Sequence, residues 1–298
     1  MTQWLWTQKQ DIGPAPRYFH ALAYDSERKL VVLFGGTVET FPNARANDTW
    51  VWNGEVWTQV ADTGPAPRLH HAMAFDSMRQ RVVLFGGFGG GSLGFNDTWE
   101  WDGEVWAQVG DTGPRTRGDH AMAFDSVRQR IVLFGGWGFS GELNDTWEWD
   151  GTEWIQVGDT GPSPREGHSM SFDVVRQRVV LFGGALYPAG TLFNDTWEWD
   201  GKDWTEVADM GPVSRCNAAM VPMGTQTVLF GGYLGNSFAG DTWEWNELRW
   251  TQRQDIGPEQ RCCHAMAHDS TRDRVVLFGG YGTGALGDTW ELPNPTDQ

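Results

Sequence analysis

The sequence predicts an all-β fold, a single six-bladed β-propeller, from two observations. Leu-Phe-Gly-Gly occurs six times at nearly constant spacing, with its second glycine at Gly36, Gly87, Gly136, Gly184, Gly232 and Gly280. A period of about 50 residues indicates stacked copies of one supersecondary unit. Each copy also contains four short runs with period-2 patterning, separated by turn residues, which predicts four antiparallel strands. Six four-stranded units are typical of a six-bladed propeller.

The first strand of each unit follows a Gly-Pro turn and an arginine: Arg17, Arg68, Arg117, Arg165, Arg215 and Arg261. Three residues later comes a histidine in five of the units: His20, His71, His120, His168 and His264. An apolar run follows, which we assign to the first strand. A turn such as Asp76-Ser77-Met78-Arg79 then leads into a β-branched second strand that ends in the double glycine.

The third strand begins at an Asp-Thr-Trp sequence after a loop that varies among the copies. Its alternating pattern, as in Trp99-Glu100-Trp101, predicts a half-buried strand. Asn-Gly or Asp-Gly follows in four copies, as at Asn53-Gly54, and predicts a two-residue hairpin turn. The fourth strand carries one tryptophan: Trp57, Trp106, Trp154, Trp204 or Trp250.

The two ends of the sequence complement each other. The last unit stops after Leu292 without a fourth strand, whereas Trp6-Thr7-Gln8 matches the fourth-strand residues Trp57-Thr58-Gln59. The N-terminal strand therefore completes the last blade. We expect one domain over residues 1–298, with blades at about 17–60, 68–109, 117–157, 165–207, 215–253 and 261–292 plus 3–9.

The double glycines, the third-strand aromatic residues and the fourth-strand tryptophan carry a resemblance over nearly the whole chain. The sequence resembles the kelch-repeat propellers, as in the central domain of galactose oxidase, kelch ubiquitin-ligase adaptors, sialic acid mutarotases and nitrile-specifier proteins. This resemblance implies the fold. It leaves function open, because the family contains both enzymes and binding modules.

Composition excludes several classes of partner. The net charge of −17 argues against nucleic acid and anionic membrane surfaces, which both require basic patches. No stretch approaches the roughly 20 apolar residues of a membrane helix. The start, Met1-Thr2-Gln3-Trp4, lacks a basic region followed by an apolar run, so we expect a cytoplasmic protein.

Antiparallel strand order places two sets of loops on one face, here called the loop face. These loops join the second strand to the third and the fourth strand to the next first strand. Loops that vary on a rigid scaffold commonly bind ligands. The resemblance implies that two positions line the mouth of the channel on this face. One follows the double glycine: Thr37, Phe88, Trp137, Ala185, Tyr233 and Tyr281. The other follows the arginine: Tyr18, Leu69, Gly118, Glu166, Cys216 and Cys262.

Trp137 departs most clearly from the repeat. Of the 19 tryptophans, it alone lies in a variable loop between second and third strands. Aromatic side chains around a mouth suit a small molecule or a peptide or protein segment. We predict a ligand site at Phe88, Trp137, Tyr233, Tyr281, Tyr18 and Arg45. The alternative is that these aromatic residues only plug the channel.

Three groups could carry chemistry. The histidines His20, His71, His120, His168 and His264 could hold a transition metal near the axis, although their repetition equally fits a structural role. The sequence requires no cofactor. His70, Asp119 and Glu166 are candidates for acid–base catalysis, or for blade contacts. Cys216, Cys262 and Cys263 are candidates for reactive thiols, or for small residues in tight positions.

Three functional hypotheses follow. The first is a propeller that binds a small molecule or peptide at the aromatic mouth. The second is an enzyme that acts on a small molecule in the same channel by acid–base or metal-assisted chemistry. The third is a structural or protein-interaction unit.

Overall fold

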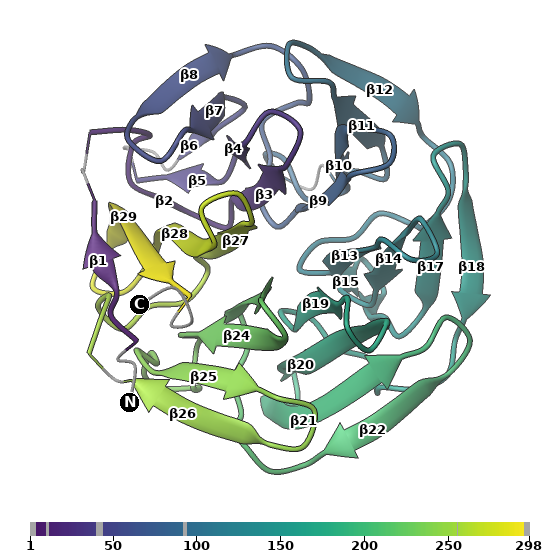
Figure 1. Cartoon of the computed structure of the whole chain (residues 1–298). Helices are drawn as coiled ribbons and strands as arrows, with labels where there is room; N and C mark the ends of the chain where they lie inside the picture. The colour runs from purple at the N-terminus through teal and green to yellow at the C-terminus, as the bar shows by residue number, and fades with distance from the viewer. Residues whose placement is uncertain (1–3, 10–11, 40–43, 92–93, 255, 295–298) are drawn as a thin grey trace.

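The computed structural model describes residues 4–9, 12–39, 44–91, 94–254 and 256–294. These residues form six four-stranded antiparallel sheets arranged in a ring (Figure 1). The innermost strands are β3 (Ala21–Asp25), β9 (Ala72–Asp76), β13 (Ala121–Asp125), β19 (Ser169–Asp173), β23 (Ala219–Met223) and β27 (Ala265–Asp269). Each lies against the innermost strand of the next sheet, and β27 lies against β3, which closes the ring.

The other strands follow outward in chain order. The second strands are β4 (Leu30–Phe34), β10 (Arg81–Phe85), β14 (Arg130–Phe134), β20 (Arg178–Leu186), β24 (Gln226–Phe230) and β28 (Arg274–Tyr281). The third strands are β7 (Thr49–Trp52), β11 (Thr98–Trp101), β17 (Thr146–Trp149), β21 (Thr191–Trp199), β25 (Thr242–Trp245) and β29 (Ala285–Pro293). The outermost strands are β8 (Trp57–Ala61), β12 (Trp106–Gly110), β18 (Trp154–Gly158), β22 (Trp204–Ala208), β26 (Trp250–Gln254) and β1 (Thr7–Gln8).

The second strands form the centre of the core. In β10, the side chains from Val82 to Phe85 are all 0% exposed. Neighbouring sheets cover both faces of these strands, which explains why the sequence reads there as an unbroken apolar run rather than an alternating one.

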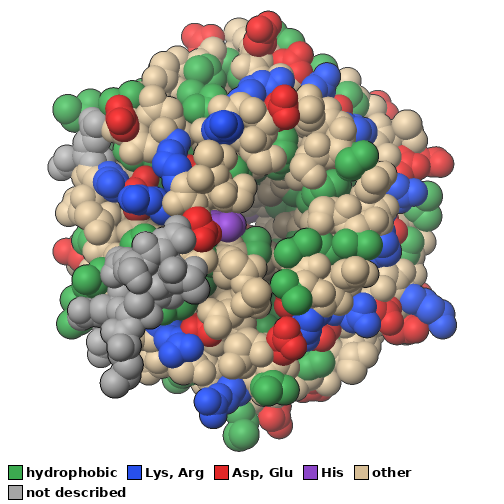
Figure 2. Space-filling model, in the orientation of Figure 1, with side chains coloured by type: hydrophobic (Ala, Val, Ile, Leu, Met, Phe, Trp, Pro, Cys, Tyr) green, Lys and Arg blue, Asp and Glu red, His purple; other side chains and the backbone are tan. Residues whose placement is uncertain are grey.

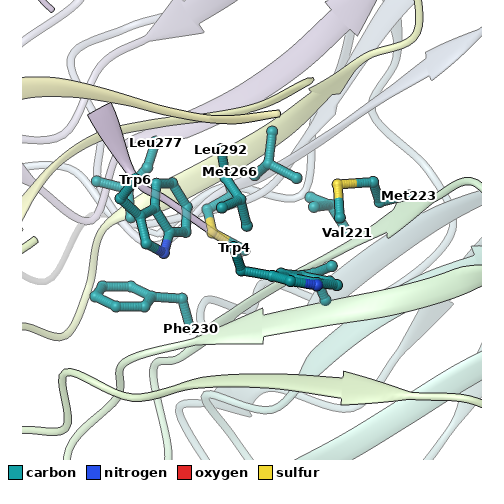
Figure 3. Packing of buried hydrophobic residues seen from close by; sticks show 10 residues of the cluster. Trp4, Trp6, Val221, Met223, Phe230, Met266, Leu277 and Leu292 are labelled. Carbon is teal, nitrogen blue, oxygen red and sulfur yellow. The ribbon is translucent and has the colours of Figure 1, made fainter. Parts of the chain in front are cut away.

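The N-terminal strand completes the last sheet, as predicted. Strand β1 pairs antiparallel with β29, with Thr7 opposite Glu291 and Gln8 opposite Trp290. Trp4 and Trp6 are buried in an apolar cluster that draws on the fifth and sixth sheets. Figure 3 shows both indoles in this cluster, where the ring centroids of Trp6 and Phe230 lie 5.4 Å apart. The predicted all-β fold of repeated four-stranded sheets, with the first strand in the last sheet, is confirmed.

A repeated ion pair holds the loop end of each sheet. The guanidinium of Arg117, which is 0% exposed, donates to both carboxylate oxygens of Asp145 at 2.7 and 2.8 Å and to the carbonyl of Gly135. Trp147 Nε1 donates to the same carboxylate. The equivalent pairs are Arg17–Asp48, Arg68–Asp97, Arg165–Asp195, Arg215–Asp241 and Arg261–Asp288. These arginines and aspartates are therefore structural parts of the repeat.

A second repeated bond joins neighbouring sheets. Each tryptophan of the outermost segment donates from Nε1 to the threonine of the Asp-Thr-Trp sequence in the preceding sheet. The donor–acceptor pairs are Trp106–Thr49, Trp154–Thr98, Trp204–Thr146, Trp250–Thr196, Trp6–Thr242 and Trp57–Thr289.

The second glycine of each pair is required by close backbone packing at the loop face. Gly87 has φ of +92°, and a Cβ there would lie 2.7 Å from the carbonyl oxygen of Leu69. A side chain would meet this strained backbone conformation and a clash with fixed backbone together. The double glycine therefore lets the second strand turn tightly against the segment that follows the arginine.

The structure differs from the sequence prediction in two local respects. Short strands occur in the loops of the loop face: β2 (Arg17–Tyr18), β5 (Thr37–Val38), β6 (Ala44–Arg45), β15 (Trp137–Gly138) and β16 (Gly141–Glu142). The hairpin at Asn53-Gly54 spans four residues rather than the predicted two, since Trp52 pairs with Trp57. The Asn53 side chain accepts from the N–H groups of Glu55 and Val56, which favours the longer turn.

Within the described residues, no helix is long and apolar enough to cross a membrane.

Candidate functional site

The structure pairs the two predicted sets of mouth residues with each other. Tyr18 in β2 lies opposite Thr37 in β5. Single antiparallel bridges join the equivalent residues in the other sheets: Leu69–Phe88, Gly118–Trp137, Glu166–Ala185, Cys216–Tyr233 and Cys262–Tyr281. The residue after the arginine and the residue after the double glycine therefore share one short antiparallel contact in every sheet.

Directly after these bridges, six backbone segments form a closed ring of hydrogen bonds around the axis. The N–H of His70 donates to the carbonyl of Phe19, and the N–H of Asp119 donates to the carbonyl of His70. The cycle continues in one direction, and the N–H of Phe19 completes it by donating to the carbonyl of Cys263. All six ring residues have a left-handed φ between +52° and +61°: Phe19, His70, Asp119, Gly167, Asn217 and Cys263. We call this the backbone ring.

Three aromatic side chains form what we call the aromatic cluster. Phe88 lies 5.0 Å from Trp137 and 5.9 Å from Phe139, measured between ring centroids. Trp137 is 39% exposed and Phe139 is 65% exposed, which is unusual for side chains of this size. Phe139 was not predicted from the sequence, although it lies in the same variable loop as Trp137.

A second group, which we call the tyrosine cluster, lies across the mouth. The ring centroids of Tyr18 and Tyr281 are 5.2 Å apart, and Phe238 continues the group to Tyr233. Burial raises the pKa of Tyr18, and the charge of Arg45 acts in the opposite direction. Arg45 is exposed in β6, opposite Thr37. The structure therefore divides the predicted aromatic mouth into two groups.

The three predicted acid–base residues come together beside the aromatic cluster. Nδ1 of His70 lies 2.6 Å from Oδ1 of Asp119. Burial, together with the negative charges of Asp119 and Glu142, raises the pKa of Glu166 to about 7, while the charge of His70 acts in the opposite direction. Glu142 was not predicted. It lies in β16 directly opposite Trp137, and one of its carboxylate oxygens accepts from the N–H of Tyr187 at 2.8 Å.

The repeated histidines lie beneath the backbone ring, between neighbouring sheets. Nε2 of His71 lies 3.1 Å from the carbonyl oxygen of Phe34, and the two rings pack edge to face. Each of the other four histidines packs against the equivalent phenylalanine of the preceding sheet, as His120 does against Phe85. Burial lowers the pKa of His20, His168 and His264 to about 3. Among the described residues, no group of three or more His, Cys, Asp or Glu side chains is arranged to hold a metal ion.

The histidines and the backbone ring enclose a cavity of about 110 Å³. A larger channel of about 860 Å³ runs between the innermost strands toward the opposite face. Its wall includes Tyr24, Phe75, Phe124, Phe172 and His268. Figure 2 shows one face of the ring, which is hollowed at its centre with hydrophobic side chains and a histidine beside the hollow.

The three cysteines are buried free thiols. Burial raises the pKa of Cys216 to about 12 and raises that of Cys263 well above its ordinary value. The Sγ atoms of Cys262 and Cys263 lie 2.8 Å apart, and Cys263 belongs to the backbone ring. A thiol with a raised pKa carries little thiolate at neutral pH, so Cys216 and Cys263 are poorly activated as nucleophiles.

Comparison with known proteins accounts for this architecture. The model of the KLHDC2/KLHL20/DRC7 kelch-repeats domain matches residues 1–154, 55–232 and 151–297, and so covers nearly the whole chain. The chain belongs to this kelch-repeat domain family. This kelch domain is also similar to dynein regulatory complex subunit 7 of Chlamydomonas reinhardtii, with 37% identity over 78 residues. The match covers 25% of the chain and 6% of that relative.

Family membership establishes the fold and indicates a general role. Kelch propellers are typically binding modules, and they generally bind proteins. The repeated arginines, aspartates, histidines and tryptophans of this kelch domain are accounted for by contacts within and between sheets. The residues that differ among sheets gather at the loop-face mouth, where the aromatic cluster and the carboxylates of Asp119, Glu142 and Glu166 lie together.

Proposed function

We propose that this kelch domain is a binding module that recognises a peptide segment of a protein partner at its loop-face mouth. The observation that carries the proposal is the exposed aromatic cluster of Phe88, Trp137 and Phe139 beside the backbone ring. Large aromatic side chains contribute most of the binding energy at many interfaces, because they offer a large area at low entropic cost.

The rigid scaffold beneath the mouth supports the same proposal. Phe88 and Trp137 are each bridged to the segment that follows the arginine of their own sheet. A surface that is already ordered loses little conformational freedom when a ligand binds. The polar groups beside the aromatic cluster would then select the sequence that binds.

Selection from a random heptapeptide library tests the proposal. Immobilised protein is incubated with the library, and the retained peptides are identified by mass spectrometry. We expect retention of a defined subset, and a loss of at least about tenfold in the Trp137→Ala protein, as is usual for a central aromatic contact. Val105→Ala is the matched control, because Val105 is 60% exposed and lies in the hairpin between β11 and β12.

Equal retention by the wild-type and Trp137→Ala proteins would contradict the proposal. Retention of no peptide by the wild-type protein would also contradict it and would favour a structural unit. Thermal unfolding of each variant confirms that it remains folded.

One observation favours a second candidate function, acid–base catalysis on a small molecule. The short contact between His70 Nδ1 and Asp119 Oδ1 is an arrangement that orients an imidazole for proton transfer. Glu166, with a pKa of about 7, would be a second proton donor or acceptor beside it. A small molecule that is chemically altered by the wild-type protein but not by His70→Gln, as followed by NMR, would support the enzyme.

A further inference from the structure

We propose that the partner segment presents a lysine or arginine side chain, and that its cationic head lies between the aromatic cluster and the carboxylates of Asp119, Glu142 and Glu166. This inference rests on the proposed function and specifies the chemistry of the ligand. It is carried by aromatic faces, charge complementarity and hydrogen-bond acceptors that meet at one sector of the mouth.

One aromatic and one acidic residue of this sector, Trp137 and Glu142, share a short hairpin. Trp137 in β15 lies directly opposite Glu142 in β16, and directly opposite residues of an antiparallel pair project from the same side. Phe88 and Phe139 extend the aromatic surface from Trp137. A cation within about 6 Å of an aromatic ring centre is attracted to the face of that ring, and tryptophan attracts it most strongly. A carboxylate on the same side adds a direct partner for its N–H groups.

Within the described part of the chain, no lysine or arginine forms an ion pair with the carboxylates of this sector. Among the described residues, none forms a hydrogen bond or ion pair with the Glu166 carboxylate. Asp119 pairs with His70, and Glu142 accepts from a backbone N–H. Arg115, on a neighbouring loop, donates to the hydroxyl of Ser140 at 3.3 Å rather than to a carboxylate. A cationic ligand would relieve the repulsion among these negative charges.

The cavity beneath the backbone ring also offers acceptors. The carbonyl of Phe34 can only accept, so Nε2 of His71 carries the proton in that contact and Nδ1 is left as an acceptor. His71, His120 and His168 line this cavity, and their buried Nδ1 atoms have no hydrogen-bond partner within the described part of the chain. Asp119 lines the same cavity. A donor-rich cation fits such a site better than an anion or a neutral apolar group does.

Four heptapeptide pools test the inference. The central residue is fixed as lysine, arginine, norleucine or glutamate, and the other positions are random but exclude lysine, arginine and histidine. Acetylated and amidated ends remove terminal charges. At pH 8, above the pKa of Glu166, we expect the lysine or arginine pool to be retained at least about tenfold better than the norleucine pool, an uncharged chain of similar length.

Charge-removing variants link that preference to the site. We expect Glu166→Gln, Asp119→Asn and Glu142→Gln together to reduce retention of the cationic pools about tenfold while leaving the norleucine pool unchanged. Glu104→Gln is the matched control, since Glu104 is exposed in the hairpin between β11 and β12 on the opposite face. Thermal unfolding shows whether each protein is folded. If the triple variant is not folded, the single Glu166→Gln variant replaces it in the binding measurement.

The outcomes separate the two proposals. If the norleucine or glutamate pool is retained as well as the cationic pools, the inference is overturned while peptide binding survives. The inference also fails if the cationic preference persists in the triple variant and in Glu166→Gln. If wild-type and Trp137→Ala proteins retain every pool equally, the proposed function itself fails.

Discussion

The indole Nε1 of Trp6 donates to Oγ1 of Thr242 at 3.0 Å, although the two residues lie 236 positions apart in the chain. On the other side of the last sheet, Trp57 Nε1 donates to Thr289 Oγ1 at 2.8 Å. Every sheet is linked to its neighbour by an equivalent bond. The N-terminal segment thus supplies one of the six links, the one between the fifth and sixth sheets.

Trp6→Ala should destabilise the protein by about 3–5 kcal/mol, because it removes a buried indole and leaves a cavity between the fifth and sixth sheets. Urea unfolding followed by circular dichroism measures the change. Trp137→Ala is the control and should cost less than about 1 kcal/mol, since Trp137 is 39% exposed. An unchanged unfolding midpoint for Trp6→Ala would show that the N-terminal strand does not close the ring.

Arg117→Met should cost about 3–5 kcal/mol, because it leaves the Asp145 carboxylate without its buried partner. Lys202→Met is the comparison. The Lys202–Asp203 pair has side chains that are 86% and 69% exposed, so its loss should be close to neutral. Similar unfolding midpoints for the two variants would mean that the repeated arginine is not needed for stability.

Acid should destabilise the protein through its buried histidines. The pKa of His168 is about 3 in the folded state and 6.5 ordinarily, so the unfolded state binds the extra proton between these values. Stability is therefore full above about pH 6.5 and falls as pH drops toward 3. Between these two pKa values, each such histidine lowers the free energy of unfolding by about 1.4 kcal/mol for each pH unit of acidification.

His168→Ala tests this slope, and the fifth sheet already has Ala218 at the equivalent position. The variant should be less stable at pH 8 because of the cavity, but its stability should fall less steeply with acid. Unfolding free energies between pH 4 and 8 measure both effects. If the free energy of unfolding depended on pH equally in the variant and the wild type, His168 would not be a neutral buried imidazole.

Glu166 should have the opposite pH dependence. Its folded pKa of about 7 lies above the ordinary value of 4.5, so its contribution to stability is full below about pH 4.5 and is lost as pH rises through 7. Asp119 and Glu142 contribute to this shift, and the charge of His70 opposes it. Glu166→Gln should therefore gain stability relative to wild type between pH 5 and 8. Direct NMR titration of the carboxyl carbon would contradict this if it gave a pKa near 4.5.

The three cysteines should react slowly with a water-soluble disulfide reagent at pH 8. Burial raises the pKa of Cys216 to about 12, and only the thiolate reacts. Unfolding in guanidinium should release all three thiols at once. Rapid modification of the native protein at any of these positions would restore the reactive-thiol hypothesis.

Most of the fold could be predicted because the same physical requirements recur in every sheet. A second strand covered on both faces must be apolar throughout, and a fourth strand needs its tryptophan to reach the preceding sheet. The six copies show these requirements at equivalent positions, as in Val83 and Val132, which are both fully buried. The pairing of the two mouth positions with each other was not predicted from the sequence.

The backbone ring could not be predicted, because backbone hydrogen bonds do not require a particular type of side chain at the residues that form them. Its residues include Phe19, Asp119 and Gly167, which share no chemistry. Glu142 and Phe139 were missed for a related reason. The sequence of their loop differs from those of the equivalent loops in the other sheets, so only its folding into the hairpin of β15 and β16 shows that they lie beside Trp137.

The left-handed conformation at the backbone ring has a consequence for protein engineering. Because the six peptide groups bond to one another, the attached side chains do not enter the bonding. The positive φ favours Gly, tolerates Asn, Asp and His best among the other residues, and disfavours β-branched residues most strongly. The side chains at these six positions can therefore be changed without removing the backbone hydrogen bonds of the ring. We expect that libraries of substitutions at Phe19, His70, Asp119 or Asn217 would change ligand specificity and leave the propeller intact.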